Sequence, residues 1–404
     1  MVEVISWAVD NFMNRFGRRM INLVFRKLQQ PPPWRWGCEG SFFERIGSTS
    51  LLLLPLELLQ QLHWWVVVPI RRGFKQAALG EDIPWQLQWK ACWLNSYRPH
   101  ELVWWWVAGV RSWTELSKHS SESLTVYRHN AHRHLWPSRC KPAQLLLSNK
   151  AALLEQVPEQ WRAPFLGLSD DHSKAVPVSS WWKAALLGHG VVLKPLRGHA
   201  GRGVVRFRWF GSTLQQEALF GRLPKHAPHF TDSQAPDPRQ LLAHWHRVYH
   251  SQEPAVATPY VCHSSELPTT EPSVVVRVVT SQPSPGAEVF VRQAWLEVPL
   301  DGDAMAFISP EGYCLPNPGK PFTTDQQNSL DQWQQLLIKG MPICVRACLD
   351  ASMLMHACLP PIDQVAWDWV PASPQPVLLE GNGCFGLLIP QLFADRRLEQ
   401  QCLD

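Results

Sequence analysis

The sequence predicts a mixed α+β (α/β) protein, and three observations lead to that prediction. Between Gln364 and Gly386 the apolar runs VAWDW and PVLLE flank a Pro/Ser/Gln turn, which is typical of two adjacent antiparallel strands. From Gly190 the segment GVVLKPLRGHAGRGVVRF places glycines between two apolar runs, which indicates a second hairpin. The stretch from Asp325 to Ala357 has amphipathic helical spacing, so we expect helices to accompany the strands.

The composition is that of a folded protein without a nucleic-acid partner. A length of 404 residues allows two or three domains and a large core. The chain is 45% hydrophobic and 18% charged, which excludes general disorder. Its net charge of +4 is only mildly basic, whereas nucleic-acid-binding surfaces cluster arginine and lysine on one face.

The cysteines and the first residues both favour a cytoplasmic protein. Ten cysteines occur without a CxxC pair. Cys344 and Cys348 are four residues apart in an expected helix, so they share one face as small buried side chains. The opening MVEVISWAVDNFMNRFGRR has acidic and polar residues within its apolar part, unlike a signal peptide. Free thiols agree with a reducing compartment.

The region 1–145 is rich in tryptophan, and we expect it to be mostly helical or a small α/β domain. Apolar residues recur at helical spacing between residues 3 and 29, with basic residues among them. This amphipathic helix could contact an anionic membrane surface peripherally, or it could pack on its own protein. The run Leu51–Ile70 is long enough to suggest a membrane span. Pro55 and Glu57 interrupt that run, which favours a buried helix followed by a strand.

Polar side chains converge on the hairpin at 364–386. Side chains alternate between the faces of a strand, so Glu380 and Asn382 point the same way and Asp368 can lie across from them. Two carboxylates and one amide suit Mg²⁺, which is usually held by one or two carboxylates together with the phosphates of a nucleotide. The alternative is a hairpin with ordinary solvent-facing acids, which are common on edge strands.

The glycine-rich hairpin has the features of a loop that covers phosphates. Lys194 ends its first apolar run, and Gly198, Gly201 and Gly203 lie in the connection. Glycines let backbone amides approach phosphate oxygens closely, and the lysine adds a positive charge. The glycines lie between two strands, so this is neither a Rossmann fingerprint nor a Walker loop. The alternative is an ordinary turn, because any tight turn uses glycine.

Two strands rich in β-branched residues are expected at 274–280 and 288–298. Arg277 and Arg292 fall inside these apolar runs. A buried arginine requires an anionic partner, which could be a phosphate group or a neighbouring carboxylate such as Glu297.

Three further helices are expected. The segment LLLSNKAALLEQV indicates a helix that is capped by Ser148 or Asn149 and begins at Lys150. Leu214–Leu223 and Arg239–His250 also have helical patterns, and a proline-rich polar loop separates them.

Two groups of histidines could bind zinc in principle. They lie in YRHNAHRH at 127–134 and in LLAHWHRVYH at 241–250. Neither group has a cysteine or carboxylate that completes a recognisable set. We therefore expect hydrogen-bonded or solvent-facing histidines.

The order and spacing of several segments resemble the ATP-grasp proteins, and within them the sugar-transfer associated ATP-grasp family. The segments are SNKAALLEQ, VVLKP with its glycines, TPYVCHSSEL, VVVRVVT, and WDW followed by VLLEGN. The resemblance covers roughly residues 145–390. It implies an ATP-grasp fold in which two α+β lobes, at 146–260 and 261–395, grip ATP, preceded by the tryptophan-rich region.

The resemblance also implies which residues bind the nucleotide. Two lysines contact the nucleotide in that family, and they match Lys150 and Lys194. The segment that follows a strand offers backbone groups to adenine, and it matches Tyr260, Val261 and Cys262. The glycine-rich loop would cover the phosphates.

The family's magnesium ligands match Asp368, Glu380 and Asn382. Many ATP-grasp ligases carry an arginine close before the first of these carboxylates, whereas this chain has the sequence VAW there. That catalytic role would have to pass to Arg277 or Arg292.

The activity implied by the resemblance is that of an ATP- and Mg²⁺-dependent carboxylate–amine ligase acting through an acyl phosphate. Sugar-transfer relatives suggest an amino-acid or sugar-linked substrate in the synthesis of cell-surface polysaccharides. Those relatives have an Asp-Asn pair and glycines where this chain has LEVPLDGDAMAFISPEG, so the substrate contacts must differ. The alternatives are a kinase of the same fold that phosphorylates a small molecule, and a non-catalytic nucleotide-binding scaffold of a glycan pathway.

Overall fold

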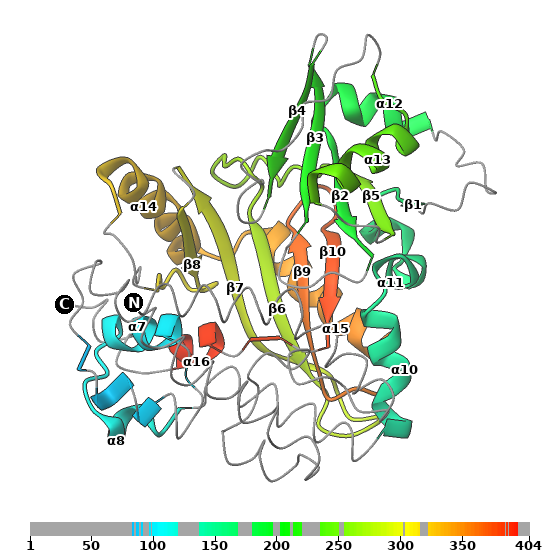
Figure 1. Cartoon of the computed structure of the whole chain (residues 1–404). Helices are drawn as coiled ribbons and strands as arrows, with labels where there is room; N and C mark the ends of the chain where they lie inside the picture. The colour runs from blue at the N-terminus through cyan, green and yellow to red at the C-terminus, as the bar shows by residue number, and fades with distance from the viewer. Residues whose placement is uncertain are drawn as a thin grey trace, which may run out of the picture. The chain divides into compact units, whose positions relative to one another are not determined.

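The computed structural model describes fifteen segments of the chain, and Figure 1 labels their helices and strands. They are residues 83–84, 86–88, 90–91, 97, 99–119, 137–168, 180–196, 203–210, 213–219, 235–249, 254–301, 304–315, 322–383, 385–386 and 388–394. The expected helix at 3–29 and the run Leu51–Ile70 lie outside them.

The chain divides into two compact units. The first unit consists of Met1–Trp136, Tyr313–Asp325 and Cys384–Asp404, and the second of Pro137–Gly312 and Gln326–Gly383. The lobe boundary predicted at residue 260 lies within the second unit, where the chain passes from one β-sheet to another. That boundary stays a prediction.

The described part of the first unit is mainly helical. It contains α7 (Pro99–Val107), α8 (Trp113–Leu116) and α16 (Leu388–Ala394). A capping box at Ser112 begins α8, with its hydroxyl accepting from the backbone N–H of Glu115. Within the described segments, no helix is both long and apolar enough to cross a membrane.

The first sheet of the second unit is five-stranded and antiparallel throughout, and we call it sheet A. Its strand order is β1 (Leu166–Leu168), β5 (Ala255–Pro259), β2 (Val191–Pro195), β3 (Val205–Phe210) and β4 (Thr213–Ala218). The predicted glycine-rich hairpin is therefore confirmed as the pair β2 and β3. The helix predicted at 214–223 is wrong where it is described, because Leu214–Ala218 instead pair with β3 in the edge strand β4.

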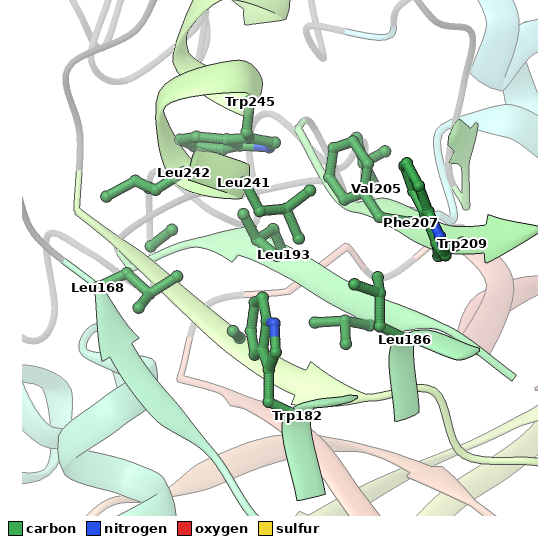
Figure 2. Packing of buried hydrophobic residues seen from close by; sticks show 13 residues of the cluster. Leu168, Trp182, Leu186, Leu193, Val205, Phe207, Trp209, Leu241, Leu242 and Trp245 are labelled. Carbon is green, nitrogen blue, oxygen red and sulfur yellow. The ribbon is translucent and has the colours of Figure 1, made fainter. Parts of the chain in front are cut away.

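Two helices cover one face of sheet A. These are α12 (Ser180–Leu187) and α13 (Pro238–Tyr249), the second of which was predicted. Alternate strand residues point toward the helices, so Trp182, Trp245, Leu193 and Phe207 lie in one buried cluster, as Figure 2 shows. Intervening residues such as Lys194 project from the opposite face.

The second sheet, which we call sheet B, is also five-stranded and antiparallel. Its order is β10 (Val377–Asn382), β9 (Gln364–Val370), β6 (Val275–Ser281), β7 (Phe290–Leu300) and β8 (Ala304–Ile308). The two predicted strands and the acidic hairpin are thereby confirmed. With its two five-stranded sheets and packed helices, the second unit has the predicted α+β class.

The predicted helical region at 325–357 forms two helices, α14 (Thr324–Lys339) and α15 (Ile343–Cys358). The interruption follows from Gly340, which has a φ of +147°, and from Pro342 at the start of α15. Helix α15 packs against β6, β7 and β9. Cys344 and Cys348 are buried on it, as predicted.

Candidate functional site

The hairpin of β9 and β10 brings three oxygen-bearing side chains together. Asp368 and Glu380 are directly paired in the strand register, and Asn382 lies two residues beyond Glu380. The Asn382 amide nitrogen donates to Glu380 Oε1 at 3.1 Å and lies 3.5 Å from Asp368 Oδ2. The sequence-based prediction that these three side chains converge is confirmed.

Two tryptophans that flank Asp368 fix the orientation of β9. The indole N–H of Trp369 donates to Ser352 Oγ on α15 at 2.8 Å, and that of Trp367 donates to Thr280 Oγ1 on β6 at 2.9 Å. Both tryptophans are fully buried. Because neighbouring residues of a strand point to opposite faces, anchoring both indoles on the α15 side directs Asp368 to the other face.

A buried histidine supports this anchoring. His356 Nε2 lies 3.0 Å from the carbonyl oxygen of Ile362, so this nitrogen carries the hydrogen. His356 Nδ1 is then the acceptor for the Thr280 hydroxyl at 2.7 Å. Burial lowers the pKa of His356, which keeps the ring neutral in this arrangement.

Lys150 reaches the acidic hairpin from the start of α11 (Lys150–Gln156). The side chain of Asn149 caps this helix by accepting from the backbone N–H of Ala152 at 3.2 Å, which confirms one of the two predicted caps. The backbone N–H of Lys150 donates to the carbonyl of Leu196, just after β2, at 3.2 Å. Its Nζ lies 3.4 Å from Glu380 Oε2.

Lys194 reaches the same hairpin from β2 of sheet A. Its Nζ donates to the backbone carbonyl of Leu379 at 3.0 Å, one residue before Glu380. Burial lowers the pKa of Lys194 to about 8, with Glu380 acting in the opposite direction and Lys150 adding to the decrease. The two lysines, 44 positions apart in the chain, thus meet at one hairpin.

Arg277 completes the cluster and pairs with Asp368. The two residues are opposite each other in the register of β6 and β9. Arg277 donates through Nε to Oδ1 at 2.5 Å and through Nη2 to Oδ2 at 2.6 Å, and its Nη1 lies 3.3 Å from Glu297 Oε1. Burial alone would lower the pKa of Arg277, but Asp368 and Glu297 raise it above its ordinary value.

The two carboxyl groups of the hairpin differ in their electrostatics. Burial raises the pKa of Asp368 to about 7, although pairing with Arg277 acts against this increase. Burial also disfavours ionisation of Glu380, but Lys150, a hydrogen bond from Asn382 and then Lys194 together lower its pKa to about 2. Glu380 therefore keeps its negative charge over the whole physiological range.

The donor set of the hairpin fits a magnesium ion. Two carboxylates and one amide offer hard oxygen ligands of the kind that Mg²⁺ prefers. The Asn382 amide would have to turn its oxygen toward the ion, which a half-turn of its terminal torsion achieves because the two ends of an amide are nearly equal in size. Turning the amide would also remove the Asn382 N–H from Asp368 Oδ2, which then keeps only its hydrogen bond from Arg277.

The segment expected to contact adenine follows β5. The backbone N–H of Tyr260 donates to the carbonyl of Gly190 at 2.9 Å, and the carbonyl of Val261 accepts from the Ser273 hydroxyl at 2.9 Å. Cys262 is exposed. The adenine-binding roles of these three residues stay predictions.

An arginine that no sequence pattern indicated holds this segment. The guanidinium of Arg206 lies 3.8 Å from the ring centroid of Tyr260, and its Nη1 pairs with Glu271 Oε1 at 2.5 Å. Its Nε donates to the carbonyl of His189 at 2.6 Å. Arg206 is only 4% exposed, whereas the Glu271 side chain is 64% exposed, so a buried arginine of sheet A pairs with an exposed carboxylate of the segment after β5.

Of the three glycines expected to cover phosphates, Gly203 is described, whereas Gly198 and Gly201 lie outside the described residues. Gly203 has a φ of +77°, and its carbonyl accepts from the Trp245 indole at 2.9 Å. Arg292 is exposed at a register irregularity of β7 and is not brought to Asp368. Of the two candidate arginines, only Arg277 lies at the site.

The histidines do not form a metal site in the described segments, where no group of three His, Cys, Asp or Glu side chains could hold an ion. His244 Nε2 lies 3.0 Å from Gln216 Oε1, so a hydrogen bond accounts for this histidine as expected. The group at 127–134 and His250 lie outside the described residues.

No known family and no curated protein matches this chain. Solved structures to which it is similar include D-alanine–D-alanine ligase from Bacillus anthracis complexed with ATP, at 10% identity and a TM-score of 0.35 over 64% of this chain and 65% of that one. The ADP complex of N5-carboxyaminoimidazole ribonucleotide synthetase matches at 13% identity and a TM-score of 0.29, over 60% and 46%. L-amino acid ligase from Bacillus licheniformis matches at 11% identity and a TM-score of 0.30, over 63% of this chain and 45% of that one. The chain covers less than two thirds of each of these proteins.

Proposed function

We propose that the second unit is an ATP-grasp fold that binds ATP with Mg²⁺, and that the protein is an ATP-dependent carboxylate–amine ligase. One observation carries this proposal. Lys150 and Lys194, which come from two different elements, meet at the acidic hairpin, where Lys150 pairs with Glu380 and Lys194 donates to the adjacent carbonyl of Leu379. The resemblance to the ATP-grasp family predicts that two lysines and the acidic hairpin lie together. These residues are far apart in the chain, so no local sequence pattern explains why they are in contact.

The charges of the site suit a ligand that brings both phosphate groups and a cation. Three cations lie beside three carboxylates, namely Lys150, Lys194 and Arg277 with Asp368, Glu380 and Glu297. The lysines would neutralise phosphate oxygens, and the hairpin would hold the cation through its carboxylates and amide. Bound Mg²⁺ would supply charge neutralisation on the phosphates during transfer of the terminal phosphoryl group.

The ligase reaction would form a carbon–nitrogen bond in two steps. A carboxylate oxygen of the substrate attacks the terminal phosphorus of ATP, so an acyl phosphate forms and ADP leaves. An amine then attacks the acyl carbon, which forms the amide and releases phosphate. Arg277 is the residue of this chain that could stabilise charge on the transferring group, because it alone of the two candidate arginines lies beside the hairpin.

The substrate class and the location of the protein are finer parts of the proposal. A small carboxylic acid and an amine, one of them an amino acid or linked to a sugar, would suit a role in cell-surface polysaccharide synthesis. This role is supported only by the resemblance of the sequence to the sugar-transfer associated family. We place the enzyme in the cytoplasm, and the helix predicted at 3–29 would be its peripheral membrane contact.

The test is ADP release from the full-length chain with a panel of amino acids and amino sugars, with and without Mg²⁺. A ligase releases ADP and phosphate only when the carboxylate and the amine are both present. A kinase gives a stable phosphorylated product without an amine, and a scaffold binds ATP without turnover. Lys194→Met and Glu380→Gln should each abolish turnover.

Two matched variants control for nonspecific effects. Lys183→Met removes an exposed lysine of α12, and Glu155→Gln removes an exposed carboxylate of α11. Both should retain full activity. Equal activity of Glu380→Gln and Glu155→Gln would contradict the proposed function.

A further inference from the structure

Arg277 lies between carboxylates on both of its neighbouring strands. On β9, Asp368 is directly opposite and accepts two hydrogen bonds, at 2.5 and 2.6 Å. On β7, Glu297 is paired with Val275, two residues along β6, and its Oε1 lies 3.3 Å from Arg277 Nη1. One guanidinium is therefore shared unequally between two acids.

Glu297 is itself held in place. The indole N–H of Trp295 donates to Glu297 Oε1 at 3.3 Å, and Trp295 is 1% exposed. Residues 295 and 297 are on the same face of β7, which is the face that Arg277 shares. The carboxylate of Glu297 therefore stays beside the arginine whatever happens at Asp368.

A cation at the hairpin would compete with Arg277 for Asp368. Both oxygens of Asp368 already accept from the guanidinium, and Oδ2 is also close to the Asn382 amide. A divalent ion on this carboxylate would face the positive charge of Arg277 at short range, which opposes its binding. The repulsion falls if the guanidinium moves toward another negative group.

We propose that Glu297 is a positioning residue that draws Arg277 away from Asp368 when a divalent cation binds to the hairpin. This inference rests on the proposed function, because it assigns the cation to Asp368, Glu380 and Asn382. The guanidinium exchanges its bidentate contact with Asp368 for a closer contact with Glu297. Asp368 is then free to act as a ligand, and Arg277 remains within the site.

A purely structural role for Glu297 gives a different expectation. If Glu297 only neutralises the partly buried Arg277, its loss lowers stability and leaves cation affinity unchanged. If it draws Arg277 away, its loss leaves Asp368 as the sole carboxylate partner of the arginine, and the hairpin binds cations more weakly. Glu297→Gln separates the two roles, because glutamine keeps the side-chain length and the acceptor for the Trp295 N–H.

The experiment measures Mn²⁺ affinity of the full-length chain in the presence of ADP, by the loss of the free Mn²⁺ signal in electron paramagnetic resonance. Glu297→Gln should raise the Kd about tenfold, a size typical of residues coupled in one ion-pair network. The control Glu155→Gln should bind as the unaltered chain does. In an Arg277→Lys background, which cannot make the same two-fold contact, Glu297→Gln should have a clearly smaller effect.

The outcomes separate this inference from the proposed function. If the unaltered chain binds no Mn²⁺ with ADP, the proposed function fails and the inference fails with it. If the unaltered chain binds and Glu297→Gln has the same Kd, only the role of Glu297 is overturned. If Glu297→Gln does not fold, Glu297→Asp is measured instead, because the shorter side chain keeps the negative charge but places it farther from Arg277. An unchanged Kd for Mn²⁺ in Glu297→Asp would also overturn the inference.

Discussion

Gly381, which lies between the two polar residues Glu380 and Asn382 of β10, gives a sharp test of how the site is packed. A Cβ at this position would lie 2.8 Å from Trp367 Cζ3 and 2.9 Å from Leu147 Cδ2. Ordinary contacts between carbon atoms are about 3.5–4.0 Å, so Gly381→Ala requires a movement of roughly an ångström. Glycine is therefore the residue that fits beside Trp367, its register partner on β9.

Any movement of the surrounding side chains costs stability. Trp367 is fully buried and its indole donates to Thr280 at 2.9 Å, and Leu147 of α10 (Pro137–Leu147) is 7% exposed. Overpacking of this kind costs about 1–3 kcal/mol. Loss of the Trp367 hydrogen bond would add about 1 kcal/mol, so we expect Gly381→Ala to cost about 2–4 kcal/mol.

Urea unfolding followed by far-ultraviolet circular dichroism measures this cost. Gly167→Ala in β1 is the matched control, because a Cβ there meets nothing within 4 Å. The control should change the free energy of unfolding by less than about 0.5 kcal/mol. Equal unfolding midpoints for the two variants would refute the packing described for the hairpin.

Three further predictions concern groups that hold the site. Ser352→Ala removes the partner of the buried Trp369 indole and should cost about 1–3 kcal/mol in urea unfolding; an unchanged midpoint would show that this hydrogen bond is not formed. Asn149→Ala removes the cap of α11 and should lower the free energy of unfolding, measured in the same way, by about 1 kcal/mol. An unchanged free energy of unfolding would contradict the described cap. Because the pKa of Glu380 lies below its ordinary value of 4.5, at about 2, its ionised form stabilises the fold above about pH 4.5, and this contribution is lost as the pH falls toward 2. The stability difference between the unaltered chain and Glu380→Gln should therefore narrow between about pH 6 and pH 3, and a constant difference would contradict the ion pair with Lys150.

The elements that the sequence predicted well have strong local signals. The two hairpins follow from apolar runs around turn residues, and the cap at Asn149 follows from its position before an apolar helical pattern. The segment at 214–223 was predicted as a helix from its helical pattern. It forms a strand because it pairs with β3, which is a tertiary effect that local propensity does not contain.

The partners within the site depend on strand register and could not be predicted fully. The sequence offered Arg277 and Arg292 as equal candidates, and only the pairing of β6 with β9 places Arg277 opposite Asp368. Glu297 was named as one alternative partner, but its simultaneous contact with an arginine already held by Asp368 was not foreseen. Ser352 on α15 gave no signal at all, because a serine within a helical pattern has no evident partner 17 residues away.

The central claim is that the two lysines and the acidic hairpin form one site for a nucleotide with its magnesium ion. Isothermal titration calorimetry with a non-hydrolysable ATP analogue, in the presence and absence of Mg²⁺, tests it most directly. We expect binding that depends on Mg²⁺ and that is lost in both Lys194→Met and Glu380→Gln but retained in Lys183→Met. Binding of equal strength in all three variants, or no binding by the unaltered chain, would contradict the claim.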